Sequence, residues 1–586
     1  MTIILGWFLV GVPLVMGALL IAVGRRLPET IQDQLTIGIT GLSLGCLSLS
    51  FFLIGMKITI LPEWWPGIGN LYLKFDPVGL AAAFWTTASG LMFYLLNLKH
   101  SSPKHWLQAG LFLFVFTTAN IAFLAGNFLL RYVALEIAAL SIAVIVLLET
   151  GSRNSKFLYL GFRLADVGLL AAILLLNASG ASLDIAKALT QALHLPPITL
   201  LWISAGFLLA VWVKIGLWPL LIWQKAAAAT ESNLTKAWFL STVMPNLGMY
   251  LLYRTAPLIT QLASMQSAVA LTAAASAVFA LLFELSKRHD DNNVWGLFAF
   301  QGSMSVFAAA HRLDVLVWIG MLVVSLVRFV MFGQQDQLPQ KRRVLKLASG
   351  IMLSTYSFIV IWAVQQQAEV RIDFWIAEAS LAILVIWLVN IGKTIPKPAT
   401  MEHNHARNWK KLGLQIIGLL LFVGMPVLIP PLMTRNRIAP QLSFSGFSLA
   451  SLPILSPAFW GLLIVVWVVN KFHWLENFSK YITLTWHLWL RRFQNIPDSI
   501  YKLTEIDLFQ KGIQKTASLA PQISQWLYVI FEKNIFESGV QFLIDKSFAF
   551  SALLRRMHTG RLRNNLLWVA ATILTALVVA LIGRVG

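Results

Sequence analysis

The residues most capable of chemistry are ionisable side chains inside long apolar stretches. The clearest is Lys214, which lies in LLWISAGFLLAVWVKIGLWPLLIW (residues 200–223), a segment long enough to cross a bilayer. An ammonium group at that depth costs about 2.5–3.5 kcal/mol on insertion scales, and buried ionisable residues in membrane helices are usually functional. Because a buried lysine can lose its proton, Lys214 is a candidate proton carrier, with a snorkelling or structural lysine as the alternative. Pro219 follows five residues later and predicts a break in the helix.

Other candidate residues are ionisable side chains in or beside further apolar stretches: Glu136, Arg163, Asp166, Lys236, Arg328 and Glu378. Arg163 and Asp166 are three residues apart, so they can pair on one helix face, and a purely structural pair is an equal alternative. Arg328 keeps its proton at physiological pH, so it would order water or repel cations and would not relay a proton. Glu378, with Asp373 near the outer mouth of the same stretch, is a candidate exit carboxylate.

The composition indicates that membrane-spanning helices hold these residues. Of the 586 residues, 58% are hydrophobic and 12% are charged, and the mean hydropathy is +0.73. Repeated apolar runs of about 20 residues in such a chain predict an all-α polytopic membrane protein with about sixteen transmembrane helices. The single Cys46 excludes disulfides, thiolate metal sites and iron–sulfur clusters on this chain. The predicted spans cover residues 3–23, 37–60, 78–98, 107–126, 128–148, 157–177, 200–223, 236–256, 266–285, 293–311, 315–333, 347–365, 374–392, 412–432, 448–470 and 564–584.

The distribution of charge predicts how the chain lies in the membrane. Most of the 45 lysines and arginines fall in alternate connections, which the positive-inside rule places in the cytoplasm, with both termini outside. The high basic charge is therefore a topology signal, and nucleic acid is not an expected partner. Residues 1–470 are predicted to form a membrane domain of about fifteen spans, and residues 564–586 a terminal transmembrane anchor. Residues 471–563 are predicted to lie on the cytoplasmic side, where apolar spacing from about Ala520 to Met557 indicates a long amphipathic lateral helix.

Short motifs recur in a fixed order on the predicted spans: LYLKFDPVGLAA (71–82), AGNFLLRYVALEIAALS (125–141), YLGFRLADVGLL (159–170), VKIGLWPLLIWQKAA (213–227), MPNLGMYLLYR (244–254) and MHTGRLRNNLLW (557–568). Each motif is weak alone, but together they resemble the antiporter-like subunits of respiratory complex I, especially the distal subunit L, and the Mrp sodium/proton antiporters. The resemblance implies an antiporter-like core at about residues 107–390. It places Lys214 on the family's central lysine and Glu136 on the glutamate whose distance from that lysine sets its protonation.

The departures from the family pattern concern the second half of the core. Family histidines fall on Leu221 and Leu240, and Lys236 stands one turn before Leu240. Two family lysines fall on Asn292 and Arg328. The twelfth predicted span, 347–365, carries no lysine or acid where subunit L has one. We therefore expect the inlet half of a proton path to be kept and the outlet half to be rebuilt or lost.

The resemblance implies a proton-translocating subunit of a complex I-like oxidoreductase, linked to NADH, ferredoxin or hydrogenase chemistry. Redox reactions would belong to partner subunits, and no cofactor or metal is expected on this chain, because no dinucleotide, phosphate-loop or haem motif is present. The expected partners are membrane and peripheral subunits, the lipid bilayer, and protons or sodium. The expected location is the bacterial plasma membrane or another energy-transducing membrane. Alternatives are a membrane subunit of an inorganic-carbon uptake or cation/proton antiport system, and a non-pumping scaffold subunit.

Overall fold

The computed structural model describes residues 5–61, 70–98, 104–230, 232, 234–286, 294–332, 339–365 and 372–394. The predicted spans 412–432, 448–470 and 564–584 and the predicted lateral helix lie outside the described residues. In chain order the elements are η1 (Trp7–Gly11), α2 (Val12–Val23), η2 (Gly24–Arg26), α3 (Glu29–Ser50), η3 (Phe51–Leu53), β1 (Lys57–Leu61), β2 (Leu71–Lys74), α4 (Pro77–Asn97), α5 (His105–Leu124), α6 (Phe128–Thr150), α7 (Ser152–Ala178), α8 (Ile185–Ala192), α9 (Pro197–Ile215), α10 (Ile222–Ala229), η4 (Thr235–Val243), α11 (Met244–Ile259), α12 (Ala263–Ser286), α13 (Trp295–Ala310), α14 (Asp314–Phe332), α15 (Pro339–Gln365) and α16 (Ile372–Thr394).

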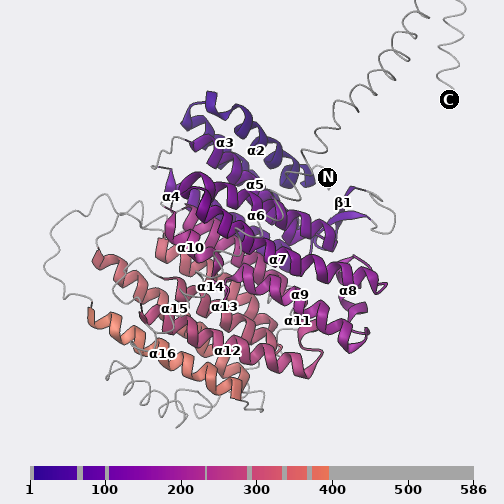
Figure 1. Ribbon diagram of the computed structural model, residues 1–586. Helices are drawn as coiled ribbons and strands as arrows, with labels where there is room; N and C mark the ends of the chain where they lie inside the picture. The colour runs from indigo at the N-terminus through magenta and orange to yellow at the C-terminus, as the bar shows by residue number, and fades with distance from the viewer. Residues whose placement is uncertain are drawn as a thin grey trace, which may run out of the picture. The chain divides into compact units, whose positions relative to one another are not determined.

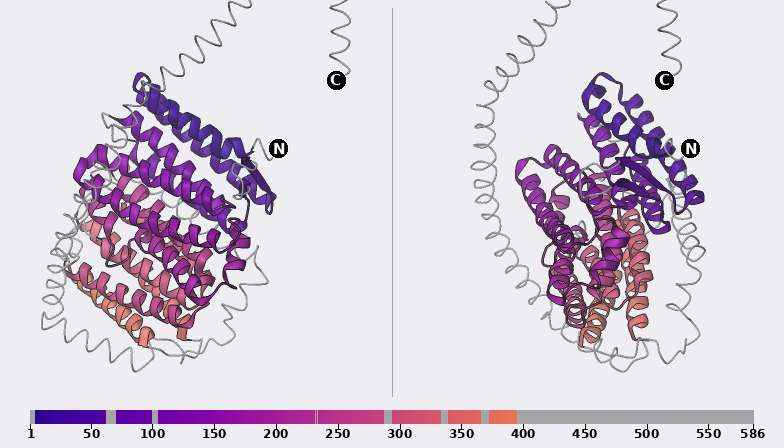
Figure 2. Two further views of the ribbon diagram at one scale, coloured as in Figure 1. Left: turned by 45° about the vertical axis from the view of Figure 1, so that its right-hand side comes forward. Right: turned by 90° about the vertical axis from the view of Figure 1, so that its right-hand side faces the viewer.

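Long apolar helices dominate the described part of the chain. Within it, ten helical segments are long and apolar enough to cross a membrane. Figure 1 shows the helices lying side by side, with α2 and α3 at one side of the bundle and α12, α15 and α16 at the other, and Figure 2 shows the same arrangement from two further directions. The chain is therefore a multi-pass helical membrane protein, and the total of about sixteen spans stays a prediction.

The second predicted span, 37–60, is wrong at both ends. The helix α3 begins at Glu29, directly after Pro28, and reaches only Ser50, with a short turn of helix following it. The chain then turns at Gly55 and forms β1, which pairs antiparallel with β2. The three consecutive β-branched residues of KITIL, Ile58, Thr59 and Ile60, favour a strand over a continued helix. The all-α class therefore holds apart from this small hairpin.

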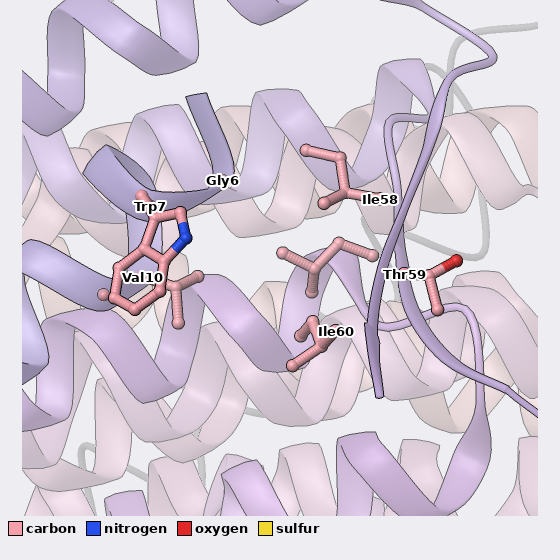
Figure 3. A pocket seen from close by; sticks show the side chains of 8 residues that line it. Gly6, Trp7, Val10, Ile58, Thr59 and Ile60 are labelled. Atoms are coloured by element: carbon pink, nitrogen blue, oxygen red, sulfur yellow. The ribbon is translucent and has the colours of Figure 1, made fainter. Parts of the chain in front are cut away.

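An apolar pocket of about 200 Å³ separates the hairpin from the first helix (Figure 3). Trp7 and Val10 line it on the side of η1, and Ile58, Ile60 and Leu73 line it on the side of the strands. The lining contains no charged side chain, so this pocket is not a candidate for proton chemistry.

The predicted span 200–223 is interrupted beside Lys214. The helix α9 ends at Ile215, because Gly216 adopts a left-handed conformation (φ 79°, ψ 54°) that terminates helices. Its N–H donates to the carbonyls of Trp212 and Val213, and the Trp212 indole donates to the Trp218 carbonyl inside the break at 3.0 Å. The helix resumes as α10. Lys214 therefore lies in the last turn before the break and not in the middle of a continuous span.

Small residues bring the neighbours of α9 unusually close. The backbones of α7 and α9 meet at Gly168 and Gly206, where an added Cβ on either residue would lie within 2.8 Å of the other's carbonyl oxygen. On α11, a Cβ at Gly248 would lie 3.1 Å from the Cβ of Lys214. Close backbone contact of this kind is a usual way for membrane helices to pack. It holds α7, α9 and α11 together around the end of α9.

Candidate functional site

Lys214 forms a fully buried ion pair with Asp166 of α7. The Lys214 Nζ lies 2.8 Å from the Asp166 Oδ1, and the two side chains are 0% and 2% exposed. Burying two charges carries a large desolvation cost, which is repaid only by good geometry and further hydrogen bonds. Within the part of the chain that the structure describes, the second oxygen of Asp166, Oδ2, accepts no hydrogen bond. Lys214 thus satisfies one of the two carboxylate oxygens of Asp166.

Glu136 and Arg163 form a second ion pair between α6 and α7. The Arg163 Nη1 donates to Glu136 Oε2, and the Tyr132 hydroxyl donates to Glu136 Oε1 at 2.8 Å. The guanidinium also lies over the Tyr159 ring, 4.8 Å from its centroid. The Arg163 side chain is 34% exposed and that of Glu136 is 12% exposed. This pair reaches the outer surface of the bundle, whereas the Lys214–Asp166 pair does not.

Two sequence expectations about these residues require correction. Glu136 does not pair with Lys214, because Asp166 occupies that position. Arg163 and Asp166 share a helix but do not pair with each other, since each has its salt bridge to a residue on another helix. The structure thus brings the predicted residues together in a different order: Lys214 to Asp166, and Arg163 to Glu136. On α7, the Arg163 of one pair and the Asp166 of the other are three positions apart in the sequence.

Lys236 lies half-buried in the π-helical segment η4. Its neighbour Thr235 donates from Oγ1 to Glu149 Oε1 at 2.6 Å, and Gln108 of α5 donates from Nε2 to the same oxygen at 2.9 Å. Sequence reasoning missed Glu149, because the predicted fifth span ended at residue 148. The helix α6 includes Glu149, so predicting this residue would have required the exact end of the helix.

Arg328 is buried in α14 and is 1% exposed. Its Nε donates to the Ser241 carbonyl at 3.0 Å, and its Nη1 donates to Gln301 Oε1. The guanidinium carbon lies 3.8 Å from the centroid of the Phe298 ring. Among the described residues, no carboxylate lies within salt-bridge distance of it. The site expected to hold a lysine therefore holds a permanent cation stabilised by neutral groups.

The second half of the core contains ionisable residues that sequence reasoning missed. The helix α15 begins at Pro339 and not at residue 347, so Lys346 lies inside it and forms a buried salt bridge with Glu284 of α12 at 3.1 Å. The helix that contains the predicted twelfth span therefore carries a lysine before the predicted bounds, although residues 347–365 themselves contain no lysine or acid. The apolar run begins only after Lys346, so hydropathy placed the start of this helix too late in the sequence. Glu378 is fully buried in α16, as its apolar surroundings predict.

Metal binding has no support in the described part of the chain. No group of three or more histidine, cysteine, aspartate or glutamate side chains there is placed to hold a metal ion. Cys46 is a buried free thiol.

The described part of the chain is a polytopic helical bundle with a buried lysine–carboxylate pair at a helix break, and it is similar to known antiporter-like membrane subunits. Residues 125–289 match the family described as "NADH:quinone oxidoreductase/Mrp antiporter, TM". This segment contains five of the predicted site residues: Glu136, Arg163, Asp166, Lys214 and Lys236. The predicted resemblance to antiporter-like subunits is thereby confirmed.

Solved structures show the same fold at low sequence identity. A chain of the membrane-bound sulfane sulfur reductase, an archaeal respiratory membrane complex, is 15% identical with a TM-score of 0.59, and the match covers 79% of this chain and 99% of that chain. A chain of the Mrp complex from Dietzia sp. DQ12-45-1b is 15% identical with a TM-score of 0.58, covering 79% and 100%. A chain of respiratory complex I from Thermus thermophilus is 18% identical with a TM-score of 0.53, covering 79% and 100%. No curated protein matches the sequence.

Proposed function

We propose that this chain is a proton-translocating membrane subunit of a complex I-like oxidoreductase, in which Lys214 takes up and releases the transported proton. One observation carries the proposal: a fully buried lysine, at a helix break, pairs with an aspartate that has a second cation within one helical turn. An ionisable pair in the interior of a membrane domain is expensive to build, and such residues usually mark ion pathways. The electron-transfer chemistry would lie on partner subunits.

The proposed mechanism is an exchange of partners at Asp166. While Asp166 pairs with Lys214, the carboxylate favours the protonated amine. Arg163 lies three residues away on α7, so it can turn from Glu136 to the unpartnered Oδ2 of Asp166. Lys214 then loses its counter-charge in a desolvated site and releases its proton. Return of Arg163 to Glu136 restores the first state.

The surface around Glu136 supports a partner subunit. Apolar side chains of α6 form an exposed stripe on the same surface: Val133, Ile137, Leu140, Val144 and Leu147. An Arg163 side chain that is one-third exposed within such a surface would face acyl chains if nothing covered it, at a cost of about 2.5–3.5 kcal/mol. A neighbouring membrane subunit with polar groups would remove that cost. It would also be the element that moves Arg163.

Proton uptake into proteoliposomes, normalised to assembled complex, tests the proposal. We expect Lys214→Ala to lower translocation by about 100-fold while partner electron transfer stays measurable, because a positioned proton carrier contributes on that order. Lys214→Arg should fail almost as badly, since guanidinium keeps its proton, whereas a structural cation would tolerate arginine. Lys187→Ala removes an exposed lysine of α8 and is the matched control. Wild-type translocation by Lys214→Ala would reject the relay.

A second candidate is cation/proton antiport. Its support is the likeness to the Mrp chain, whose TM-score of 0.58 is almost the same as the 0.59 of the sulfane sulfur reductase chain. A sodium gradient distinguishes antiport from redox-driven proton translocation. Proton movement driven by an imposed sodium gradient, without an electron donor, would select antiport.

A non-pumping scaffold is the third candidate, and Arg328 is the observation in its favour. A permanent cation stands at the position where the family resemblance implies a titratable lysine. If the chain is a scaffold, the Lys214→Ala variant should assemble normally and translocation by the complex should be unchanged. The Lys214 experiment therefore also decides this case.

A further inference from the structure

We propose that His311 and Asp373 form the site at which protons leave this chain on the outer side. The inference rests on the proposed function and supplies the outlet that the family pattern did not reveal. The His311 Nε2 lies 3.0 Å from the Asp373 Oδ2, and the two side chains are 10% and 6% exposed. Histidine is the side chain whose unperturbed charge change lies between pH 5 and 8, so this pair can load and unload a proton under physiological conditions.

The position of the pair fits an exit. His311 directly follows α13, and Asp373 lies in the first turn of α16. His311 is the last residue of the predicted span 293–311 and Asp373 directly precedes the predicted span 374–392, and the positive-inside rule places both of these span ends outside. The His311 ring packs edge-to-face on Phe307, with 4.6 Å between the centroids, and the backbone N–H of His311 donates to the Phe307 carbonyl at 3.2 Å. The imidazole is therefore held on α13 with its Nε2 directed to the carboxylate of α16.

A line of hydrogen-bonding side chains leads along α13 towards the pair. Gln301 binds Arg328 and also donates from Nε2 to the Gly320 carbonyl at 2.9 Å. One turn later, Ser305 Oγ lies 2.8 Å from the Tyr356 hydroxyl, which is also 3.0 Å from the Leu316 carbonyl. All the side chains in this line are buried. A serine–tyrosine hydroxyl pair can pass a proton by exchanging donor and acceptor roles.

The remaining separation along the helix is short. His311 follows Ser305 by six positions, which is about 9 Å at the rise of an α-helix. Water would have to bridge this interval. The proton balance is simple: the neutral imidazole accepts a proton from the inner side, Asp373 stabilises the imidazolium, and the imidazolium donates the proton to outer water. No oxidant or reductant is needed.

The other described polar groups near the His311–Asp373 pair would not take its place as a proton carrier. The described charged neighbours are Arg312, whose Nη2 donates to the Thr260 carbonyl at 3.0 Å, and Asp314 in the first turn of α14. On α12, the neutral Gln266 donates from Nε2 to the Ala310 carbonyl at 2.8 Å. His311 is the titratable base at this end of α13, and Asp373 is its ion-pair partner.

The test uses the assembled complex in proteoliposomes and measures translocation per complex between pH 5.5 and 8. His311→Gln keeps a side chain that can hydrogen-bond to Asp373 but cannot carry a proton. We expect it to lower translocation by about 100-fold and to flatten the pH dependence in this range. His194→Gln, an exposed histidine on the same predicted side, should behave like the wild type. Translocation by His311→Gln within about twofold of wild type, whatever the amount assembled, would overturn the inference and leave the pair as a structural link.

Two further arms separate the possible failures. His311→Gly should regain translocation when imidazole is added to the outer solution, and absence of that rescue would count against proton release at this site. Lys214→Ala is measured in parallel. If Lys214→Ala abolishes translocation and His311→Gln does not, only the exit is wrong. If neither variant loses translocation, the proposed function itself fails.

Discussion

Lys346 of α15 and Glu284 of α12 form a buried ion pair that joins two helices of the second half of the core. The Nζ–Oε1 distance is 3.1 Å, and the side chains are 7% and 0% exposed. The Glu284 Oε2 accepts from the Gly296 N–H at 3.2 Å, and the Lys346 ammonium lies 5.7 Å from the centroid of the Trp387 ring. Among the described residues, each half of the core therefore buries a lysine–carboxylate pair, and of these two pairs the one at Lys214 stands beside a broken helix.

The Lys346–Glu284 pair predicts strong non-additivity. Lys346→Met or Glu284→Leu alone should destabilise the protein by about 3–5 kcal/mol, because either change leaves an uncompensated buried charge. The double variant should recover most of the loss, since an apolar pair of similar volume often replaces a buried ion pair without cost. Thermal unfolding of the purified protein measures the effect, with Lys187→Met as the exposed control. A double variant that loses the sum of the single effects would contradict this account.

Gly216 and Gly180 allow a matched test of the helix break. Both residues have positive φ, 79° and 76°, so alanine should cost about 1–2 kcal/mol at each. Only at Gly216 would the new methyl group clash, 2.3 Å from the Trp223 indole nitrogen, whereas nothing lies within 4 Å at Gly180. Gly216→Ala should therefore lower the unfolding temperature further than Gly180→Ala. It should also lower translocation, because it displaces the turn that carries Lys214. Equal effects of the two variants would show that the break does not depend on Trp223.

The hydrogen bonds of Asp184 predict a stability change at acidic pH. Burial acts to raise the pKa of Asp184, but the Tyr72 hydroxyl, the Lys187 N–H, the Lys57 charge and the Ala186 N–H outweigh it and hold the pKa below its ordinary value. A carboxylate with a lowered pKa stabilises the folded state above its unfolded pKa of about 3.9, and this contribution is lost as the pH falls through the folded value.

Tyr72→Phe removes the hydroxyl that donates to Asp184, so its folded pKa should move towards the ordinary value. The difference in unfolding temperature between wild type and Tyr72→Phe should be constant from pH 5 to 7 and should shrink below about pH 4. A difference that stays constant down to pH 3 would assign the effect of Tyr72 to packing alone.

The predicted orientation can be tested by labelling single cysteines after Cys46→Ser. We expect Gly180→Cys and His194→Cys to react with an impermeant thiol reagent from outside, and Lys156→Cys to react only after the membrane is opened. His194 and Lys156 are exposed, and Gly180 has open space beside it, so access does not limit the reaction. Labelling of Lys156→Cys in intact cells would reverse the orientation and place the His311–Asp373 pair on the inner side.

Sequence reasoning found the core of the site in two ways. Lys214 stood out as a charge inside an apolar span, and the motifs that resemble the family supplied Asp166, Arg163 and Glu136. The structure places all four at the contacts of α6, α7 and α9. The partners could not be predicted, because three-residue spacing along α7 allows Arg163 and Asp166 either to pair with each other or to reach neighbouring helices. Which occurs depends on the crossing of α7 and α9 at Gly168, a tertiary feature.

The misses share a different cause. Hydropathy marks the apolar middle of a helix and not its ends, so Glu149 and Lys346 were placed in connections although α6 and α15 contain them. His311 and Asp373 likewise bordered predicted spans and gave no sign of being partners, because 62 residues separate them in the chain. The hairpin at Lys57 was missed because five alternating residues inside an apolar run do not distinguish a strand from a helix.

The break between α9 and α10 also constrains how the protein is made. Residues 216–221 lack continuous helical hydrogen bonding, and backbone groups of this kind cannot face lipid without a cost of several kcal/mol each. In the finished protein, Gly248 of α11 and Gly302 of α13 pack directly against Ile215 at the start of the break. Both helices are synthesised after α9, so residues 216–221 are made before the helices that pack beside them. Completion of the span should therefore wait for α13, and nascent chains that stop before Trp295 should leave residues 216–221 open to added protease.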